Sequence, residues 1–203
     1  LQGDLMVSRG YVPLEDAQNV AVQAVADFNQ DGFDDVVLRN EQTGEWSINL
    51  LKNREIIGSI SPDMSKVLSW EIIAAKDFDG NSSPDILIRN KISGAWYMYF
   101  YENTNVINRG YISSLRNDLD EEVQGIGDFN GDGKFGILFR NIETGWWGMS
   151  ELHGMQAGNM NNIMQNYGEN WQINDVNDYN GDGYSDISLR DNNTGQLLSL
   201  IHI

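Results

Sequence analysis

Four short loops rich in carboxylate and amide side chains carry the clearest chemical signal in this 203-residue sequence. Each loop has an oxygen-bearing side chain at its first, third and fifth positions, and three of the four have Asp at the ninth. Alternating side chains of a tightly wound loop direct their oxygens toward one centre, and the seventh residue adds its backbone carbonyl. The predicted ligands are Asp27, Asn29, Asp31, Phe33 and Asp35; Asp77, Asp79, Asn81, Ser83 and Asp85; Asp128, Asn130, Asp132 and Lys134; and Asp178, Asn180, Asp182, Tyr184 and Asp186.

An all-oxygen ligand set indicates Ca²⁺, because hard cations prefer carboxylate, amide and carbonyl oxygens whereas softer metals prefer nitrogen and sulfur. The chain has no cysteine, which excludes a thiolate metal site, a disulfide framework and a cysteine nucleophile. The loops are not EF-hands, since an EF-hand needs Glu at its twelfth position. That position holds Leu38, Ile88, Phe139 and Leu189.

Two loops depart from the common pattern. The third loop has Gly136 at the ninth position, so we expect its site to be the weakest, or to be completed by water. The second loop has Ser82 where the others have a turn glycine, followed by Pro84, but it keeps five possible ligands. The alternative interpretation is that all four loops are Asx-rich turns that hold no metal.

The loops belong to four sequence repeats. Their first residues are Asp27, Asp77, Asp128 and Asp178, so successive repeats start 50, 51 and 50 residues apart. Each repeat continues with an Arg, predicted to bond carbonyls or a carboxylate between blades, with a ligand clamp as the alternative. A Thr-Gly or Ser-Gly pair then predicts a hairpin turn. A Trp, replaced by Leu in the fourth repeat, predicts packing between blades. In repeat order, the arginines are Arg39, Arg89, Arg140 and Arg190, the turn glycines are Gly44, Gly94, Gly145 and Gly195, and the last position holds Trp46, Trp96, Trp147 and Leu197.

Four strands are expected in each repeat. The stretches VAVQAVADF, DVVLRN, WSINLL and EIIGSI are apolar, rich in β-branched residues and bounded by turn signals, and no stretch has sustained helical periodicity. Four-stranded repeats of this length are typical of propeller blades. We therefore predict an all-β protein in which residues 1–203 form a single four-bladed β-propeller. Its repeat cores are expected to start near residues 20, 70, 121 and 171.

The N-terminal segment is expected to complete the last blade. Residues 6–12, MVSRGYV, resemble residues 106–112, VINRGYI, which are predicted to be an outer strand. Residues 1–13 are therefore predicted to be the outer strand of the last blade, closing it and covering two sheet edges. The alternative is that the chain is a fragment of a larger propeller.

The spacing of the acidic loops resembles that of FG-GAP or VCBS repeats, which are known from integrin α-subunit propellers and many bacterial surface proteins. The resemblance covers nearly the whole chain. It implies one Ca²⁺ for each loop, up to four ions in all, and an extracellular, secreted or cell-surface protein.

The charge of the chain excludes some classes of binding partner. The formal net charge is −17, and Lys and Arg do not cluster, so a nucleic-acid partner is not expected. Anionic membranes are disfavoured for the same reason. No apolar run approaches the roughly 20 residues that span a bilayer, so no membrane insertion is expected.

The expected function is binding, as an extracellular recognition or adhesion module. Its expected partner is either a glycan, which would make it lectin-like, or a cell-surface protein. Trp146 departs from the repeat pattern, and an exposed Trp can stack on a sugar ring. The alternative is that Trp146 is a packing residue or a surface aromatic without a ligand. Tyr97, Tyr99 and Tyr101 are further ligand-binding candidates. No catalytic motif is present, so the chain is not expected to be an enzyme. The alternatives are a structural subunit of a cell-surface assembly and a domain of a polysaccharide-active enzyme.

Overall fold

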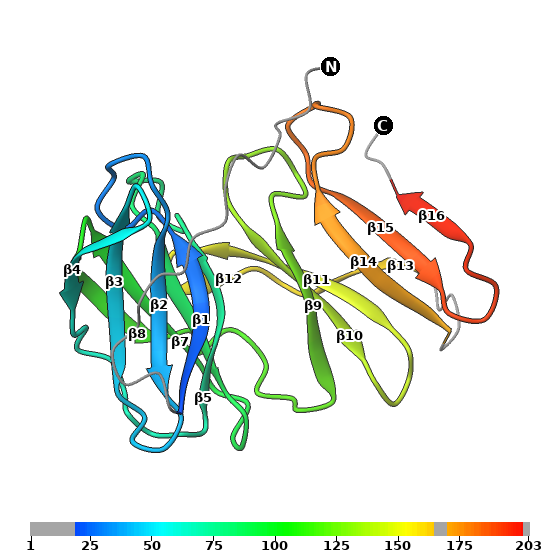
Figure 1. Cartoon of the computed structure of the whole chain (residues 1–203). Helices are drawn as coiled ribbons and strands as arrows, with labels where there is room; N and C mark the ends of the chain where they lie inside the picture. The colour runs from blue at the N-terminus through cyan, green and yellow to red at the C-terminus, as the bar shows by residue number, and fades with distance from the viewer. Residues whose placement is uncertain (1–18, 165–169, 201–203) are drawn as a thin grey trace.

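The computed structural model describes residues 19–164 and 170–200, and this part of the chain contains strands and turns but no helix (Figure 1). Within it, therefore, no helix is available to span a membrane. The strands form four antiparallel sheets that follow one another in chain order, in the arrangement of a four-bladed β-propeller. The predicted all-β propeller fold is confirmed.

Each sheet corresponds to one sequence repeat. The first blade consists of β1 (Val20–Ala26), β2 (Asp35–Asn40), β3 (Trp46–Lys52) and β4 (Glu55–Ile60). The second consists of β5 (Trp70–Lys76), β6 (Asp85–Asn90), β7 (Trp96–Glu102) and β8 (Asn105–Tyr111). The third consists of β9 (Glu121–Gly127), β10 (Gly136–Asn141), β11 (Trp147–His153), β12 (Gln156–Ala157) and β13 (Asn161–Met164), the last two both pairing with β11.

The fourth blade has three described strands, β14 (Trp171–Asn177), β15 (Asp186–Asp191) and β16 (Leu197–Leu200). The prediction that residues 1–13 add its outer strand lies outside the described residues. The innermost strands β1 and β5 contact each other, as do β9 and β14, so first strands gather toward the centre of the arrangement.

Buried apolar side chains fill the spaces between successive blades. Trp46 of the first blade packs in one cluster with Ile88 of the second. Trp96 of the second blade meets Phe139 of the third edge to face, with ring centroids 5.7 Å apart. Trp147 of the third blade lies in a cluster with residues of the fourth. The predicted packing of the repeated Trp residues between blades is confirmed.

The repeated Arg residues join neighbouring blades. Arg89 Nη1 donates to the carbonyl of Glu121 at 2.6 Å, and Nη2 donates to the carbonyl of Asp118, both in the segment that begins the third blade. The Arg89 guanidinium also lies over the ring of Trp96, 4.8 Å from its centroid. Arg39 and Arg140 repeat this arrangement over Trp46 and Trp147. The predicted bonding to carbonyls between blades is therefore confirmed, and the stacking on Trp is an addition to it.

Candidate metal centre

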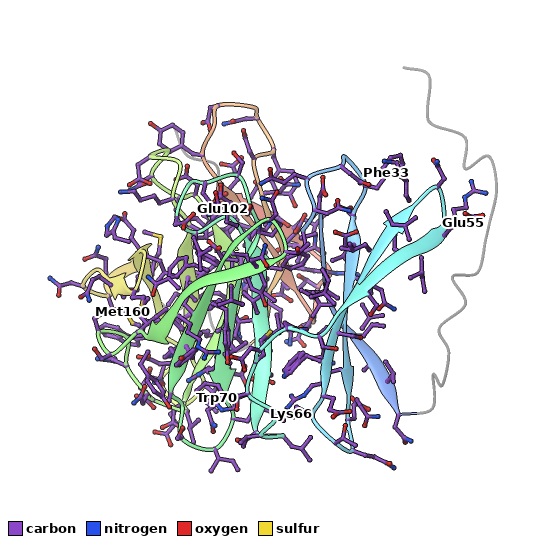
Figure 2. The ribbon with its side chains drawn as sticks, turned by 90° about the vertical axis from the view of Figure 1, so that its left-hand side faces the viewer. Phe33, Glu55, Lys66, Trp70, Glu102 and Met160 are labelled. Carbon is purple, nitrogen blue, oxygen red and sulfur yellow. The ribbon has the colours of Figure 1, made fainter. Side chains whose placement is uncertain are left out.

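The acidic loops connect the first two strands of each blade and lie together at one end of the propeller. Figure 2 shows Phe33 of the first loop and Glu102, which ends β7, at this end, whereas Lys66 and Trp70 lie at the opposite end. Alternation of antiparallel strands explains the placement, because the turn between the first and second strands and the turn between the second and third must lie at opposite ends.

Backbone hydrogen bonds hold the loop side chains inward. In the second loop Asp77 Oδ2 accepts from the amide of Ser82 at 2.7 Å, and Asp77 Oδ1 accepts from the amide of Asn81 at 3.1 Å. Asp79 Oδ1 also accepts from the Asn81 amide, at 3.1 Å. The other loops repeat these Asx turns. The oxygen-bearing residues therefore shape the loop as well as lining its centre.

The ninth-position Asp fastens the loop to the sheet. Asp85 is fully buried, and its Oδ2 accepts from the amide of Phe78 at 2.8 Å while its Oδ1 accepts from the amide of Tyr101 in β7 at 2.9 Å. Asp35 makes the equivalent contacts in the first blade. In the third blade Gly136 has no side chain to do this, and the amide of Leu152 donates to the carbonyl of Phe135 at 3.1 Å instead.

Three carboxylates converge in the second loop. One oxygen each from Asp77, Asp79 and Asp85 lies within 4.8 Å of the others, and no other described residues form such a group of three acidic or histidine side chains. The pKa of Asp85 is raised to about 7, first by burial and then by the negative charges of Asp79 and Asp77, against the backbone hydrogen bonds that lower it. Gathering these charges is unfavourable unless a cation neutralises them. The donor set therefore fits a hard cation.

The first and third loops are less favourable cation sites than the second. In the first loop Lys52 Nζ lies 3.2 Å from Asp31 Oδ2, so an ammonium group already interacts with one predicted ligand. Sequence reasoning missed this pair, because Lys52 ends the third strand and only the folded blade brings it to the loop. The third loop has no ninth-position carboxylate, and Asn130 Nδ2 donates to Glu151 Oε1 at 2.8 Å.

Ser82 adopts a left-handed conformation with φ of 71°, whereas Gly32, Gly133 and Gly183 occupy this position in the other loops. A non-glycine residue pays about 1–2 kcal/mol for this conformation, partly offset by the lower entropy of its unfolded chain. We expect Ser82→Gly to stabilise the protein by about 0.5 kcal/mol, measured by urea unfolding. Ser113→Gly, at an exposed site without positive φ, should slightly destabilise it. Equal effects of the two substitutions would contradict this explanation.

The aromatic ligand candidates occupy different environments. Tyr99 is only 4% exposed, and its hydroxyl oxygen accepts from the amide of Ser65 at 3.0 Å, so it offers little surface to a ligand. Tyr97 is half-buried and lies in an aromatic cluster with Trp70 and Tyr111. Tyr101 is fully buried. Trp146, in contrast, is 56% exposed at the β10–β11 turn, away from the acidic loops.

The chain matches no protein-family model and no curated protein sequence. The sheets themselves therefore define the class of protein, a four-bladed β-propeller. The resemblance to FG-GAP and VCBS repeats rests on the spacing of the acidic loops alone.

Proposed function

We propose that this chain is a calcium-binding β-propeller of the FG-GAP/VCBS type that acts as an extracellular recognition module. The observation that carries the calcium proposal is the convergence of Asp77, Asp79 and Asp85 within 4.8 Å of one another. The same loop adds the Asn81 side chain and the carbonyl of Ser83 as potential oxygen ligands. Ca²⁺ takes six to eight oxygens in flexible geometry, whereas Mg²⁺ demands near-ideal octahedral geometry and keeps several waters. A loop of mixed carboxylate, amide and carbonyl donors suits Ca²⁺ better.

Calcium is expected to stabilise the fold. At a free concentration one hundred times the Kd, one site contributes about 2.7 kcal/mol, because the ion binds the folded state and not the unfolded chain. For a domain of this size that corresponds to a rise in Tm of roughly 5–10 °C. Thermal unfolding monitored by circular dichroism, in millimolar calcium and after chelation, measures the shift, and isothermal titration calorimetry measures the affinity. A melt and a titration both unchanged by calcium would refute the proposal.

Asp79→Asn is the sharpest test of the second loop. The amide oxygen can still accept the hydrogen bond from the Asn81 amide, so the loop shape is kept while one ligand charge is lost. We expect the tightest calcium site to weaken by at least about tenfold, since charge count sets the affinity of such sites. Asp34→Asn, at an exposed residue outside every predicted ligand set, is the matched control.

The recognition part of the proposal is tested separately from calcium. A glycan array in millimolar calcium examines carbohydrate binding, and capture on immobilised cell-surface proteins examines the other class of partner. Stable filaments or large oligomers in light scattering would favour a structural subunit instead. Release of reducing sugar from polysaccharides would favour a domain of a polysaccharide-active enzyme.

A further inference from the structure

The third blade differs from the other blades at two repeat positions, where it has a glutamate and an additional tryptophan. Where the second and fourth blades begin with Trp70 and Trp171, the third begins with Glu121. Trp146, in turn, replaces Glu45, Ala95 and Gln196 at the position before the repeated Trp. The exchange does not simply relocate a packing residue, because Trp70 is 8% exposed and Trp146 is 56% exposed.

A hollow of about 310 Å³ lies where these two changes meet. Trp146 lines it together with Glu121, which is only 4% exposed, and with Arg116, Asn141 and Thr144. The hollow is at the β10–β11 turn, so it lies at the end of the blade away from the acidic loop between β9 and β10. An aromatic surface, a buried carboxylate and more exposed polar side chains therefore share one concave site, as in small-molecule binding sites.

Glu121 and Asn141 keep hydrogen-bonding capacity for a ligand in the hollow. Arg116 Nη1 donates to Glu121 Oε1 at 2.6 Å, and a carboxylate accepts up to about four hydrogen bonds, so Glu121 can accept more. Asn141 Oδ1 accepts from the Thr144 amide at 2.9 Å, but its Nδ2 has no partner among the described residues. The equivalent Asn90 Nδ2 in the second blade donates to Ser69 Oγ at 2.9 Å.

We propose that this hollow binds a neutral pyranose sugar, with the apolar face of the ring on Trp146 and its hydroxyls hydrogen-bonded to Glu121, Asn141 and Arg116. The inference rests on the recognition function proposed above and gives it a ligand class and a site. A sugar ring has an apolar face and a polar rim, and it suits a site with an aromatic surface beside both donors and acceptors. The net charge of −17 and the buried Glu121 carboxylate disfavour an anionic sugar.

The first blade provides an internal comparison. It has a hollow of the same volume, about 310 Å³, lined by Val20, Glu45, Trp46 and Lys66 among others. There Glu45 pairs with Lys66 at 3.0 Å, and both side chains are exposed. This hollow has neither an exposed aromatic platform nor a buried carboxylate, so the inference assigns sugar binding to the third blade and not to the first.

The test begins with an array of neutral and acidic oligosaccharides in millimolar calcium. Saturation-transfer NMR with the methyl pyranosides of glucose, galactose, mannose and fucose then measures binding of single sugars. We expect at least one neutral sugar to bind. We expect Trp146→Glu, which introduces the polar residue of the first blade, to weaken that binding about tenfold. Glu121→Gln should weaken it by a similar factor, because a charged acceptor is lost. Glu45→Gln in the first-blade hollow should leave it unchanged.

The outcomes separate this inference from the calcium proposal. Loss of sugar binding in Trp146→Glu, with its calcium-dependent Tm shift intact, supports the site, since the variant is then folded. Absence of binding to every neutral sugar, binding unchanged by Trp146→Glu, or binding of acidic sugars only overturns the site while leaving the calcium proposal standing. A chain that binds sugar but no calcium would refute the calcium proposal alone.

Discussion

Gly94→Ala is expected to destabilise the protein by about 3 kcal/mol. Gly94 has φ of 69°, and a Cβ added to it would lie 2.3 Å from the carbonyl oxygen of Asn117. That oxygen belongs to the segment leading to the third blade, so the substituted turn cannot relax without moving backbone. The left-handed conformation contributes about 1–2 kcal/mol of the cost and the overlap contributes the rest.

Gly195 gives the matched control for this prediction. It occupies the same turn in the fourth blade with φ of 73°, but a Cβ there would meet none of the described residues within 4 Å. Gly195→Ala is therefore expected to cost only about 1 kcal/mol, from the backbone conformation alone. Urea midpoints at constant m-value measure both changes. Equal losses would show that the close approach to Asn117 does not contribute.

Arg89→Met is expected to have an effect of similar size, a loss of about 3 kcal/mol. The methionine keeps an unbranched chain for packing, but it removes the guanidinium donors to the carbonyls of Asp118 and Glu121 and the contact over Trp96. The Asp118 carbonyl keeps one donor, the amide of Glu121 at 3.4 Å. A buried acceptor left unsatisfied costs about 1–3 kcal/mol. A cation–π contact contributes about 0.5–1 kcal/mol when exposed and about 2 kcal/mol when buried, as the contact of Arg89 with Trp96 is.

Arg190 is the control for Arg89, since it occupies the same repeat position but is exposed in the described structure. Arg190→Met should change the free energy of unfolding by less than about 0.5 kcal/mol. Unfolding in urea, followed by Trp fluorescence, compares the two variants. If Arg89→Met lowered the free energy of unfolding by less than Arg190→Met, the hydrogen bonds of Arg89 would not stabilise the contact between the second and third blades.

Much of the fold could be predicted from the sequence because its signals are local and repeated. The turn signals and β-branched stretches define the strands, and the nearly constant spacing of the first loop residues, Asp27, Asp77, Asp128 and Asp178, defines the blades. The stacking of Arg89 on Trp96 was predictable but missed. The two residues flank a hairpin turn and pair directly across it, so their side chains share one face of the sheet.

The ligand sites were less accessible to sequence reasoning, because they combine residues whose proximity depends on the assembled blades. Lys52 reaches Asp31 from the end of another strand. Glu121 and Trp146 are separated by two strands and the acidic loop, and nothing local indicates that they line one hollow. The available signal was comparative. Glu121 replaces the apolar residues Val20, Trp70 and Trp171 that begin the other blades, and Trp146 replaces three non-aromatic residues.

The hydrogen bonds by which Arg39, Arg89 and Arg140 join each blade to the next, here called arginine joints, also bear on how such a protein can change its number of blades in evolution. The described hydrogen bonds of each arginine run from a side chain of one repeat to backbone carbonyls that open the next, as those of Arg39 run to Val67 and Trp70. Backbone carbonyls are present whatever the side chains are, so a joint places little demand on the sequence of the repeat that accepts it. Duplication or deletion of a whole 50-residue unit therefore recreates the joint at the new boundary. Blade number can drift by unequal recombination, while each copy remains free to acquire its own surface residues.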